Sequence, residues 1–243
     1  SVKLARPIRL GYWFGSTPSF AGQEEVWGAT RSEDAIFELS TCPRCPAGDA
    51  KARLVWKKDH RKQDIEQLEC TKCNLVLNSD HLALTRKSVQ DRPADVLFAS
   101  TESLNRQIAD TKSHRAFGID SDKPVRLVLL DEIHTYEGSG GAQTAYLLRR
   151  YSHSVRRPIV WVGLSATLAN PRSFMSQLVG LPEGGIEVIE PTVAELEPYG
   201  GEYSLMLRHD PSFKTGLLSL TIQTAILLSR CLDNSSGIRA KLI

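Results

Sequence analysis

Short apolar runs alternate with helical patterns along most of this chain. Each run is apolar at nearly every position and stops abruptly at polar residues. Strands that are apolar throughout and alternate with helices are typical of a parallel sheet covered on both faces. The sequence therefore predicts an α/β fold with helices on both faces of a parallel sheet. The predicted strands are Arg9–Phe14, Asp95–Ala99, Val125–Leu130 and Pro158–Leu164, with Glu187–Ile189 as a candidate fifth.

Helical patterns follow the later strands. The predicted helices are Ser103–Thr111, Gly141–Tyr151 and Arg172–Val179. A segment rich in proline and glycine, Glu190–Arg208, is predicted to be a connector. After it, an apolar helical pattern covers Phe213–Asp233, and Arg239–Ile243 resembles the beginning of another strand.

The segment 24–92 interrupts this alternation and carries four of the five cysteines. They form two CxxC pairs, and each pair can turn its thiolates toward one ion. Four thiolates make a closed tetrahedral site for a structural Zn²⁺. A redox CxxC would need a thioredoxin-like context, which the sequence does not show. The sequence therefore predicts a zinc-ribbon insertion with Cys42, Cys45, Cys70 and Cys73 as ligands and a hairpin of Ala52–Lys57 with Ile65–Glu69 between them.

Polar residues stand directly after the third and fourth predicted strands. Asp131-Glu132-Ile133-His134 follows one strand, and Ser165-Ala166-Thr167 follows the next. In parallel sheets the ligand lies at the carboxyl ends of the strands, so we expect both strings to face one nucleotide pocket. One carboxylate suits Mg²⁺ and its neighbour can deprotonate the attacking water. A lone DExH string is a weak signal and a Ser or Thr is a common helix cap, but the two together favour an ATPase.

The two strings resemble motifs II and III of superfamily 2 DExH-box helicases. The segment RLGYWFGSTP (9–18) resembles the strand and turn after the first nucleic-acid-contacting motif, with Ser16 where Asp is usual. TESL (101–104) resembles the T-P-E-x-L motif without its Pro. LANP (168–171) resembles the branch with bacterial repair helicases and the helicase of the DISARM anti-phage system. The resemblance covers most of the chain outside 24–92.

This resemblance implies a RecA-like architecture. Residues 1–23 and 93–200 would form part of the first RecA-like motor domain, 24–92 the zinc-binding insertion, and 201–243 the connector and the start of a second RecA-like domain. ATP and Mg²⁺ would be cofactors besides Zn²⁺. Asp131 would hold Mg²⁺ and Glu132 would activate water. His134, Ser165 and Thr167 would couple nucleotide state to strand grip, unless His134 is a structural histidine. Thr101 and Glu102 would lie near the nucleic-acid backbone, with DNA favoured over RNA.

Two elements of such a motor are missing from the 243 residues. They contain no G-x-x-x-x-G-K-[S/T] phosphate loop and no arginine-finger motif. Because one such arginine is worth roughly 10³–10⁵ in rate, we expect this chain alone to hydrolyse ATP negligibly. The remaining helicase segments or a partner subunit would then be its partners. The alternative is a non-enzymatic helicase-like scaffold that binds nucleic acid, and a third is another ATPase on the same type of fold.

Charge and hydropathy narrow these hypotheses only slightly. The net charge is +2, which permits nucleic-acid binding without arguing for it. A basic stretch with Lys57, Lys58 and Arg61 lies near Trp56; it either grips phosphates while Trp56 stacks a base, or it is a solvated hairpin face with Trp56 as its core. No apolar run approaches a membrane span and no signal peptide is evident, so the prediction is a cytoplasmic protein without a membrane partner.

Overall fold

The computed structural model describes residues 6–47, 49–192, 195 and 216–232. The chain divides into two compact units, Ser1–Ile189 and Glu190–Ile243. All of the predicted motifs lie in the first unit. Within it, the four main predicted strands are present and pair in parallel.

Strand β1 (Leu10–Trp13) lies between β8 (Leu82–Ala83) and β9 (Val96–Ala99), and both neighbours run parallel to it. Strand β10 (Leu127–Leu130) pairs in parallel with β11 (Val160–Gly163). Side chains from β1, β9, β10 and β11 meet in one apolar cluster, so the two sheets share a core. The candidate fifth strand at Glu187–Ile189 is wrong, because that segment is a loop.

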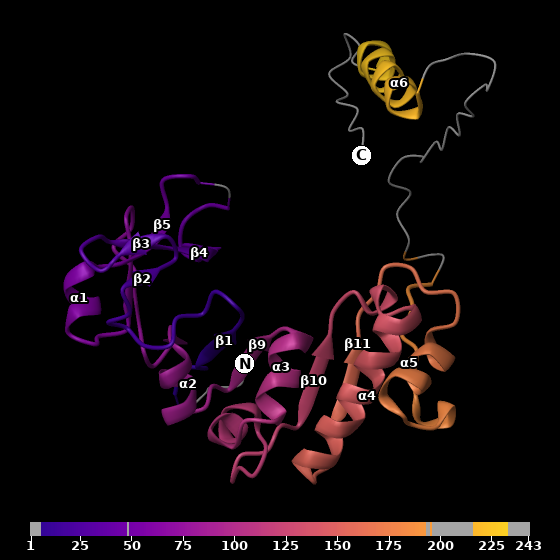
Figure 1. Ribbon diagram of the computed structural model, residues 1–243, viewed down its shortest axis with the longest axis horizontal. Coiled ribbons are helices and arrows are strands. Elements are labelled where there is room, and N and C mark those ends of the chain that lie inside the picture. The colour runs from indigo at the N-terminus through magenta and orange to yellow at the C-terminus, as the bar shows by residue number, and fades with distance from the viewer. Residues whose placement is uncertain (1–5, 48, 193–194, 196–215, 233–243) are drawn as a thin grey trace. The chain divides into compact units, whose positions relative to one another are not determined.

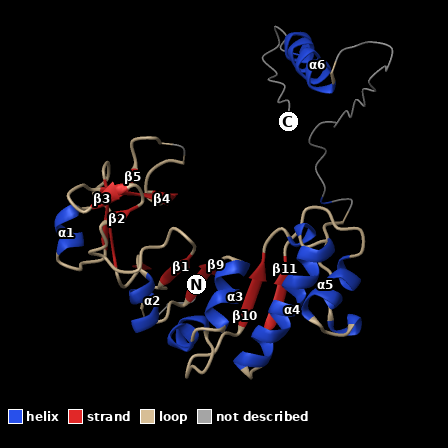
Figure 2. Cartoon of the chain, in the orientation of Figure 1, coloured by secondary structure: helices blue, strands red, loops and turns tan. Residues whose placement is uncertain are grey.

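Helices cover one face of these strands (Figures 1 and 2). They are α2 (Arg86–Asp91), α3 (Thr101–Ile108), α4 (Gly138–Val155) and α5 (Pro171–Val179), with 3₁₀ turns at η1 (Thr111–Phe117), η2 (Ile133–Thr135) and η3 (Glu183–Gly185). Side-chain oxygens at Thr85, Ser100 and Asn170 accept the orphan amides that begin α2, α3 and α5. These caps explain why α2, α3 and α5 begin directly after Thr85, Ser100 and Asn170.

The opposite face of the strands carries no helix in the described part of the first unit. Alternate side chains along a strand point to opposite faces. On β9, β10 and β11 one set packs against the helices, while the other set is largely exposed. The prediction of helices on both faces is therefore wrong for this part of the chain. The exposed set includes Val96, Phe98, Leu127, Leu129 and Val160.

The segment between β1 and β8 is a small antiparallel assembly, called the zinc module after the ion predicted for its four cysteines. Its strands are β2 (Glu25–Val26), β3 (Ala29–Thr30), β4 (Ala35–Thr41), β5 (Arg53–Trp56), β6 (Gln67–Cys70) and β7 (Val76–Asn78), with the short helix α1 (Lys58–Lys62) after β5. Strands β5 and β6 pair with Leu54 opposite Cys70, so the predicted hairpin is confirmed. Because β8 and α2 pack on β1, the parallel part begins again before residue 92.

The aromatic core of the zinc module reaches the parallel sheet. Trp56 is fully buried, and Trp27 packs against Trp56 and Phe37 with ring centroids 5.7 and 5.0 Å apart. Tyr12 of β1 lies 5.5 Å from Phe37 and donates a hydrogen bond to the Leu84 carbonyl. The module therefore covers the end of β1 on the face that the helices leave open.

The second unit contains helix α6 (Leu217–Leu232), inside the predicted range Phe213–Asp233. The predicted strand at Arg239–Ile243 and most of the connector lie outside the described residues. Among the described helices, none is long and apolar enough to cross a bilayer.

Arg61 provides a test of what holds the module together. Its side chain is fully buried and donates to the carbonyls of Thr30, Glu33 and Gln23 at 2.9, 3.1 and 3.2 Å. Arg61→Met would leave three acceptors without this donor, and we expect a loss of about 2 kcal/mol or more in unfolding free energy. Urea unfolding measures it.

Lys58→Met, on the exposed side of the same helix, is the control and should change stability by less than about 0.5 kcal/mol. Equal unfolding midpoints for the two variants would contradict a structural role for Arg61.

Candidate functional site

The two polar strings leave neighbouring strands at the same level. The parallel register pairs Leu130 with Gly163, and the ladder continues past the strand ends. The Leu164 amide donates to the Leu130 carbonyl at 2.8 Å, and the Ile133 amide donates to the Leu164 carbonyl at 3.0 Å. These backbone hydrogen bonds hold the Asp131–His134 turn beside Ser165.

A side-chain contact joins the two strings. His134 Nδ1 lies 3.1 Å from Ser165 Oγ and 3.3 Å from Glu132 Oε2. Ser165 Oγ donates its proton to the Thr167 carbonyl at 3.2 Å. With Ser165 donating to Thr167, a proton on His134 Nδ1 satisfies the contacts with both Ser165 and Glu132. Thr167 joins the group through its backbone carbonyl in this conformation.

The acidic pair faces solvent at the carboxyl end of β10. Asp131 and Glu132 are both exposed, and the Glu132 amide donates to Asp131 Oδ1 at 3.0 Å. Tyr136 lies close by: burial raises the pKa of its hydroxyl, and the charge of Asp131 raises it further. Exposed carboxylate oxygens at a strand end fit the ligand preference of Mg²⁺, which keeps several waters and takes one or two carboxylates.

Glu132 adopts a backbone conformation that few L residues occupy. Its φ of 48° and ψ of 47° lie in the left-handed region. This backbone conformation costs about 1–3 kcal/mol and persists only where surrounding contacts impose it. Here the turn η2 imposes it, because both the Thr135 amide and the Thr135 hydroxyl donate to the Glu132 carbonyl.

Two glycines, Gly163 and Gly141, shape this edge, and the sequence alone did not reveal the close contacts that require them. A Cβ atom on Gly163 would lie 2.8 Å from Ile133 Cδ1 and 3.1 Å from Met175 Sδ, so the Gly lets the DEIH turn pack against β11 and α5. A Cβ atom on Gly141 would lie 2.1 Å from the Tyr136 carbonyl oxygen. The pattern of small residues that opens α4 was the available signal for this close approach.

Thr101 and Glu102 begin α3 at the carboxyl end of β9. Because Trp13 of β1 pairs in parallel with Ala99 of β9, the turn after β1 and the start of α3 lie at the same edge of the sheet. Thr101 is half-buried, and Glu102 forms an exposed ion pair with Arg106 at 2.6 Å.

The basic stretch of the zinc module does not form one surface. Lys57 pairs with Asp34 at 3.2 Å and Lys58 is exposed, but Arg61 is fully buried. Trp56 is also fully buried and donates to the Ile65 carbonyl at 2.8 Å. The geometry favours the interpretation in which Trp56 is the core of the hairpin, and it gives Arg61 no access to a phosphate.

The four cysteines of the zinc module converge. All four Sγ atoms lie within 4.8 Å of one another. Cys42 and Cys73 are 3.4 Å apart and Cys45 and Cys70 are 3.9 Å apart, far beyond the S–S bond of a disulfide. A tetrahedral site with Zn–S bonds near 2.3 Å has S–S separations of about 3.8 Å. The cluster thus fits a zinc ion, which would be held by these four thiolates.

The local electrostatics prepare part of this cluster for a cation. The amides of Cys73 and Lys72 point at Cys70 Sγ, at 3.5 and 3.4 Å, and lower the pKa of that thiol to about 6. Burial, followed by the neighbouring thiols, raises the pKa of Cys45 to about 12. A bound Zn²⁺ would stabilise the thiolate of Cys45 and so remove the penalty that burial and the neighbouring thiols impose on it.

Two curated proteins are similar to parts of this chain. The uncharacterized ATP-dependent helicase YprA of Bacillus subtilis is 36% identical over 135 residues, 54% of this chain and 18% of that protein. The uncharacterized ATP-dependent helicase MJ1574 of Methanocaldococcus jannaschii is 28% identical over 110 residues, 44% of this chain and 16% of that protein. The resemblance to helicases is thereby confirmed, and the chain matches less than a fifth of the length of these relatives.

No protein-family model matches the chain. Crystal structures of the DUF1998 helicase MrfA are similar over 40% of this chain at 27% identity, which is 13% of the DNA-bound chain and 15% of the chain without DNA. The TM-scores are 0.35 and 0.34.

Gly141 and Gly140 offer a matched pair of substitutions next to the acidic turn. Gly141→Ala would drive a methyl group into the Tyr136 carbonyl, whereas a Cβ on Gly140 meets nothing within 4 Å. We expect Gly141→Ala to cost about 1–3 kcal/mol, and Gly140→Ala to stabilise by about 0.5–1 kcal/mol, since Ala is the better helix former. Thermal unfolding measures both; a harmless Gly141→Ala would rule out the close approach.

Zinc content tests the cysteine cluster. We expect one Zn²⁺ per chain by elemental analysis, and chelation should unfold the zinc module because metal binding and folding are coupled. Cys70→Ser should lower the bound zinc, while Cys231→Ser, at the fifth cysteine of the sequence, should not. Zinc retained at full stoichiometry in Cys70→Ser would refute the four-cysteine site.

Proposed function

We propose that this chain supplies the ATP-hydrolysing edge of the first motor domain of a nucleic-acid helicase or translocase. The observation that carries the proposal is the contact of His134 with both Ser165 and Glu132, across two neighbouring parallel strands. The acidic turn at Asp131 and the turn at Ser165 lie at one edge of the sheet. A change at the acidic turn during hydrolysis can therefore be transmitted to the turn at Ser165. The two similar ATP-dependent helicases support the same activity.

Each side chain at this edge receives a role in the proposal. Asp131, at the tip of β10, would hold Mg²⁺, which supplies charge neutralisation at the phosphates when bound. Glu132 would take the proton of the attacking water. Because His134 donates toward Glu132 and Ser165 together, loss of negative charge at Glu132 would shift this proton toward Ser165. The Ser165–Thr167 turn would thereby couple nucleotide state to strand grip.

The nucleic acid would run along the same edge. Thr101 and Glu102 would lie near the backbone of the strand, with exposed Lys58 and half-buried Lys57 on the zinc module as further contacts. We favour DNA over RNA. Arg61 is left out of this surface because its side chain is buried.

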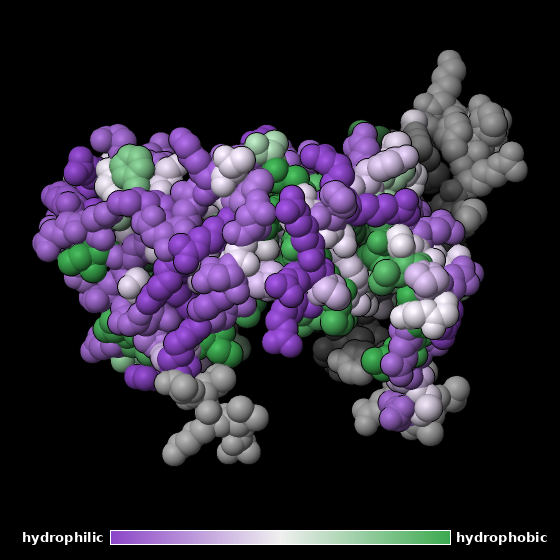
Figure 3. All heavy atoms as spheres, turned by 90° about the horizontal axis from the view of Figure 1, so that it is seen from below, coloured by the Kyte–Doolittle hydropathy of each residue, from purple (hydrophilic) through white to green (hydrophobic). Residues whose placement is uncertain are grey.

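The domain organisation follows from this proposal. Residues 1–23 and the stretch from β8 to Ile189 would be part of a RecA-like domain, because β8 and α2 pack on β1 although the predicted insertion 24–92 included them. The cysteine-bearing remainder of the insertion would be a structural zinc ribbon, and the second unit, from Glu190, would lead into a second RecA-like domain. The phosphate loop and the arginine finger, absent from these 243 residues, would come from other parts of the same machine. The uncovered apolar face of β9, β10 and β11 is a surface for such a segment, because exposed apolar areas of this kind mark interfaces. Figure 3 shows hydrophobic side chains between hydrophilic ones on the side seen from below.

The missing phosphate loop also favours a second candidate, a helicase-like scaffold that binds nucleic acid without hydrolysing ATP. The sequence of the longer protein discriminates the two. A phosphate loop elsewhere in it supports the motor, and a protein lacking one throughout supports the scaffold.

The acid pair is tested in the longer protein that carries this segment. Glu132→Gln keeps the shape of the side chain but removes the base, and we expect nucleic-acid-stimulated ATP hydrolysis to fall about 10²–10⁴-fold. Steady-state phosphate release measures it. Glu137→Gln is the matched control, because Glu137 is exposed and its side chain makes no cap hydrogen bond to α4.

The isolated 243-residue chain should release phosphate negligibly in the same assay. Hydrolysis by Glu132→Gln at the wild-type rate would overturn the role of Glu132 as the base. Robust stimulated hydrolysis by the isolated chain would overturn the proposal that other segments supply the phosphate loop and the arginine finger.

A further inference from the structure

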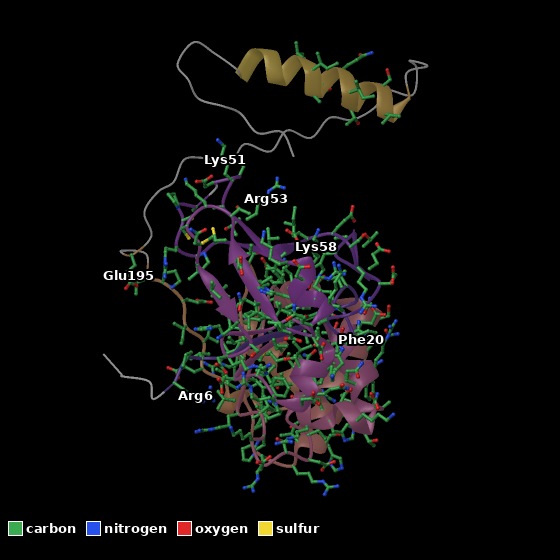
Figure 4. The ribbon with its side chains drawn as sticks, turned by 90° about the vertical axis from the view of Figure 1, so that its left-hand side faces the viewer. Arg6, Phe20, Lys51, Arg53, Lys58 and Glu195 are labelled. Carbon is green, nitrogen blue, oxygen red and sulfur yellow. The ribbon has the colours of Figure 1, made fainter. Side chains whose placement is uncertain are left out.

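A basic groove lies on the zinc module, away from the cysteine cluster. Its volume is about 550 Å³, and it is lined by exposed Phe20, Arg31, Lys62 and Lys87, together with Asp64. A Cβ atom on Gly22 would lie 3.7 Å from Arg31 Nη2 and 3.9 Å from Phe20 Cδ2, so the cation and the ring flank one glycine. Figure 4 shows Phe20 at the rim of the molecule, apart from Lys51 and Arg53.

The positive charge of the groove is mostly uncompensated. Lys87 faces Asp64 at 3.4 Å in an exposed pair, which contributes little. Arg31 and Lys62 form no ion pair within the described part of the chain. Burial lowers the pKa of Arg61, and the charge of neighbouring Arg31 lowers it further, which places a second guanidinium beside the first. The charges of Asp34 and Glu24 act on Arg61 in the opposite direction and offset part of this effect. Among the residues that line the groove, Arg31, Lys62 and Lys87 still outnumber the single carboxylate of Asp64, and such an excess of cations favours a bound anion.

Buried Arg61 holds the walls of the groove in position. Its guanidinium donates to the Gln23 carbonyl, three residues after Phe20, and to the carbonyls of Thr30 and Glu33, which bracket Arg31. Lys62 follows Arg61 directly in α1. From the other side, the Lys87 amide donates to the Ser19 carbonyl at 3.1 Å. Four side chains from distant parts of the sequence are therefore fixed around one hollow before any ligand arrives.

The aromatic ring distinguishes this groove from a simple anion site. Phe20 is 49% exposed, a large fraction for a Phe held at the end of a well-anchored turn. A base can stack on such a ring, while its flanking phosphates meet cations. An acidic peptide would use the cations but would gain no stacking from Phe20.

The position of the groove agrees with the path of a strand. The turn that carries Phe20 follows β1, and the parallel pairing of β1 with β9 sets this turn at the same edge as Thr101. A single strand that runs along the carboxyl ends of β9 and β1 would reach the groove next.

We propose that this groove binds single-stranded nucleic acid, with phosphates at Arg31, Lys62 and Lys87 and one base stacked on Phe20. The proposal rests on the proposed function, since it extends the path of the nucleic acid in that motor onto the zinc module. It gives the insertion a role in strand binding besides its structural zinc, and it gives Arg61 a positioning role.

The experiment measures fluorescence anisotropy of a labelled single-stranded oligothymidylate with the zinc-loaded chain over a range of salt concentrations. Arg31→Glu/Lys62→Glu should weaken binding by at least 10-fold, and the slope of log K against log salt should fall by about 0.7 for each phosphate that the variant no longer neutralises. Phe20→Ala should weaken binding by about 5- to 100-fold with an unchanged salt slope, because it removes stacking and no charge.

Arg126→Glu/Arg157→Glu is the control. It makes the same change in charge at two exposed arginines that precede β10 and β11, at the amino ends of these strands. Because nonspecific electrostatics would treat the two double variants alike, we expect the control to bind within about 3-fold of the wild type. Zinc content and circular dichroism confirm that every variant is folded.

Three results would overturn the proposal that this groove binds nucleic acid. They are an equal loss of affinity in both double variants, wild-type affinity in Arg31→Glu/Lys62→Glu, or no oligonucleotide binding by the wild-type chain. Displacement of the oligonucleotide by polyglutamate, with Phe20→Ala binding normally, would identify an acidic-peptide site and would also overturn it. None of these results bears on the ATP hydrolysis of the longer protein, so failure of the groove and failure of the motor are separable.

Discussion

The candidate nucleotide edge depends on the parallel pairing of β10 with β11. The backbone ladder of these strands extends through Leu164 to Ile133, so it sets the relative positions of the acidic turn and the Ser165 turn before any side chain contributes. A slip of one residue would turn each strand's side chains to the other face and would separate His134 from Ser165. Gly163 protects this register, because a larger residue there would push Ile133 away from β11.

Buried polar groups play the same part in the zinc module that the ladder plays in the sheet. The cysteine cluster fixes one end of the β-strands, and Arg61 fixes the loops at the other end through three carbonyls. Tyr12 then connects the module to β1 by ring packing and by its hydrogen bond to Leu84. The module and the sheet consequently share the turn after β1, and surfaces built there draw residues from both.

The sequence predicted what is local or repeated along the chain. The parallel strands, the helices after them and the cysteine pairs each have a short-range pattern, and the structure contains them within a few residues. Prediction from the sequence failed where a contact between distant residues determines the position of a side chain or strand. In the sequence Arg61 resembles one more surface cation of a basic run. In the structure its side chain is buried and donates to three carbonyls that are distant in the sequence. Strand β8 has two residues and no periodicity, and Gly141 matters only because Tyr136 folds back onto it.

Net charge is a poor guide to binding in this molecule for the same reason. A balance of +2 over 243 residues suggests no preference for an anion, and the most basic run of the sequence divides between an ion pair, an exposed lysine and a buried arginine. The groove gathers Lys62 of that run with Arg31 and Lys87, which are distant from it in the sequence, within one hollow. Charges interact over about 8 Å at physiological salt, so an anion responds to this local set and not to the sum over the chain. The fold therefore converts a nearly neutral sequence into a surface with a cationic groove and an aromatic platform at its rim.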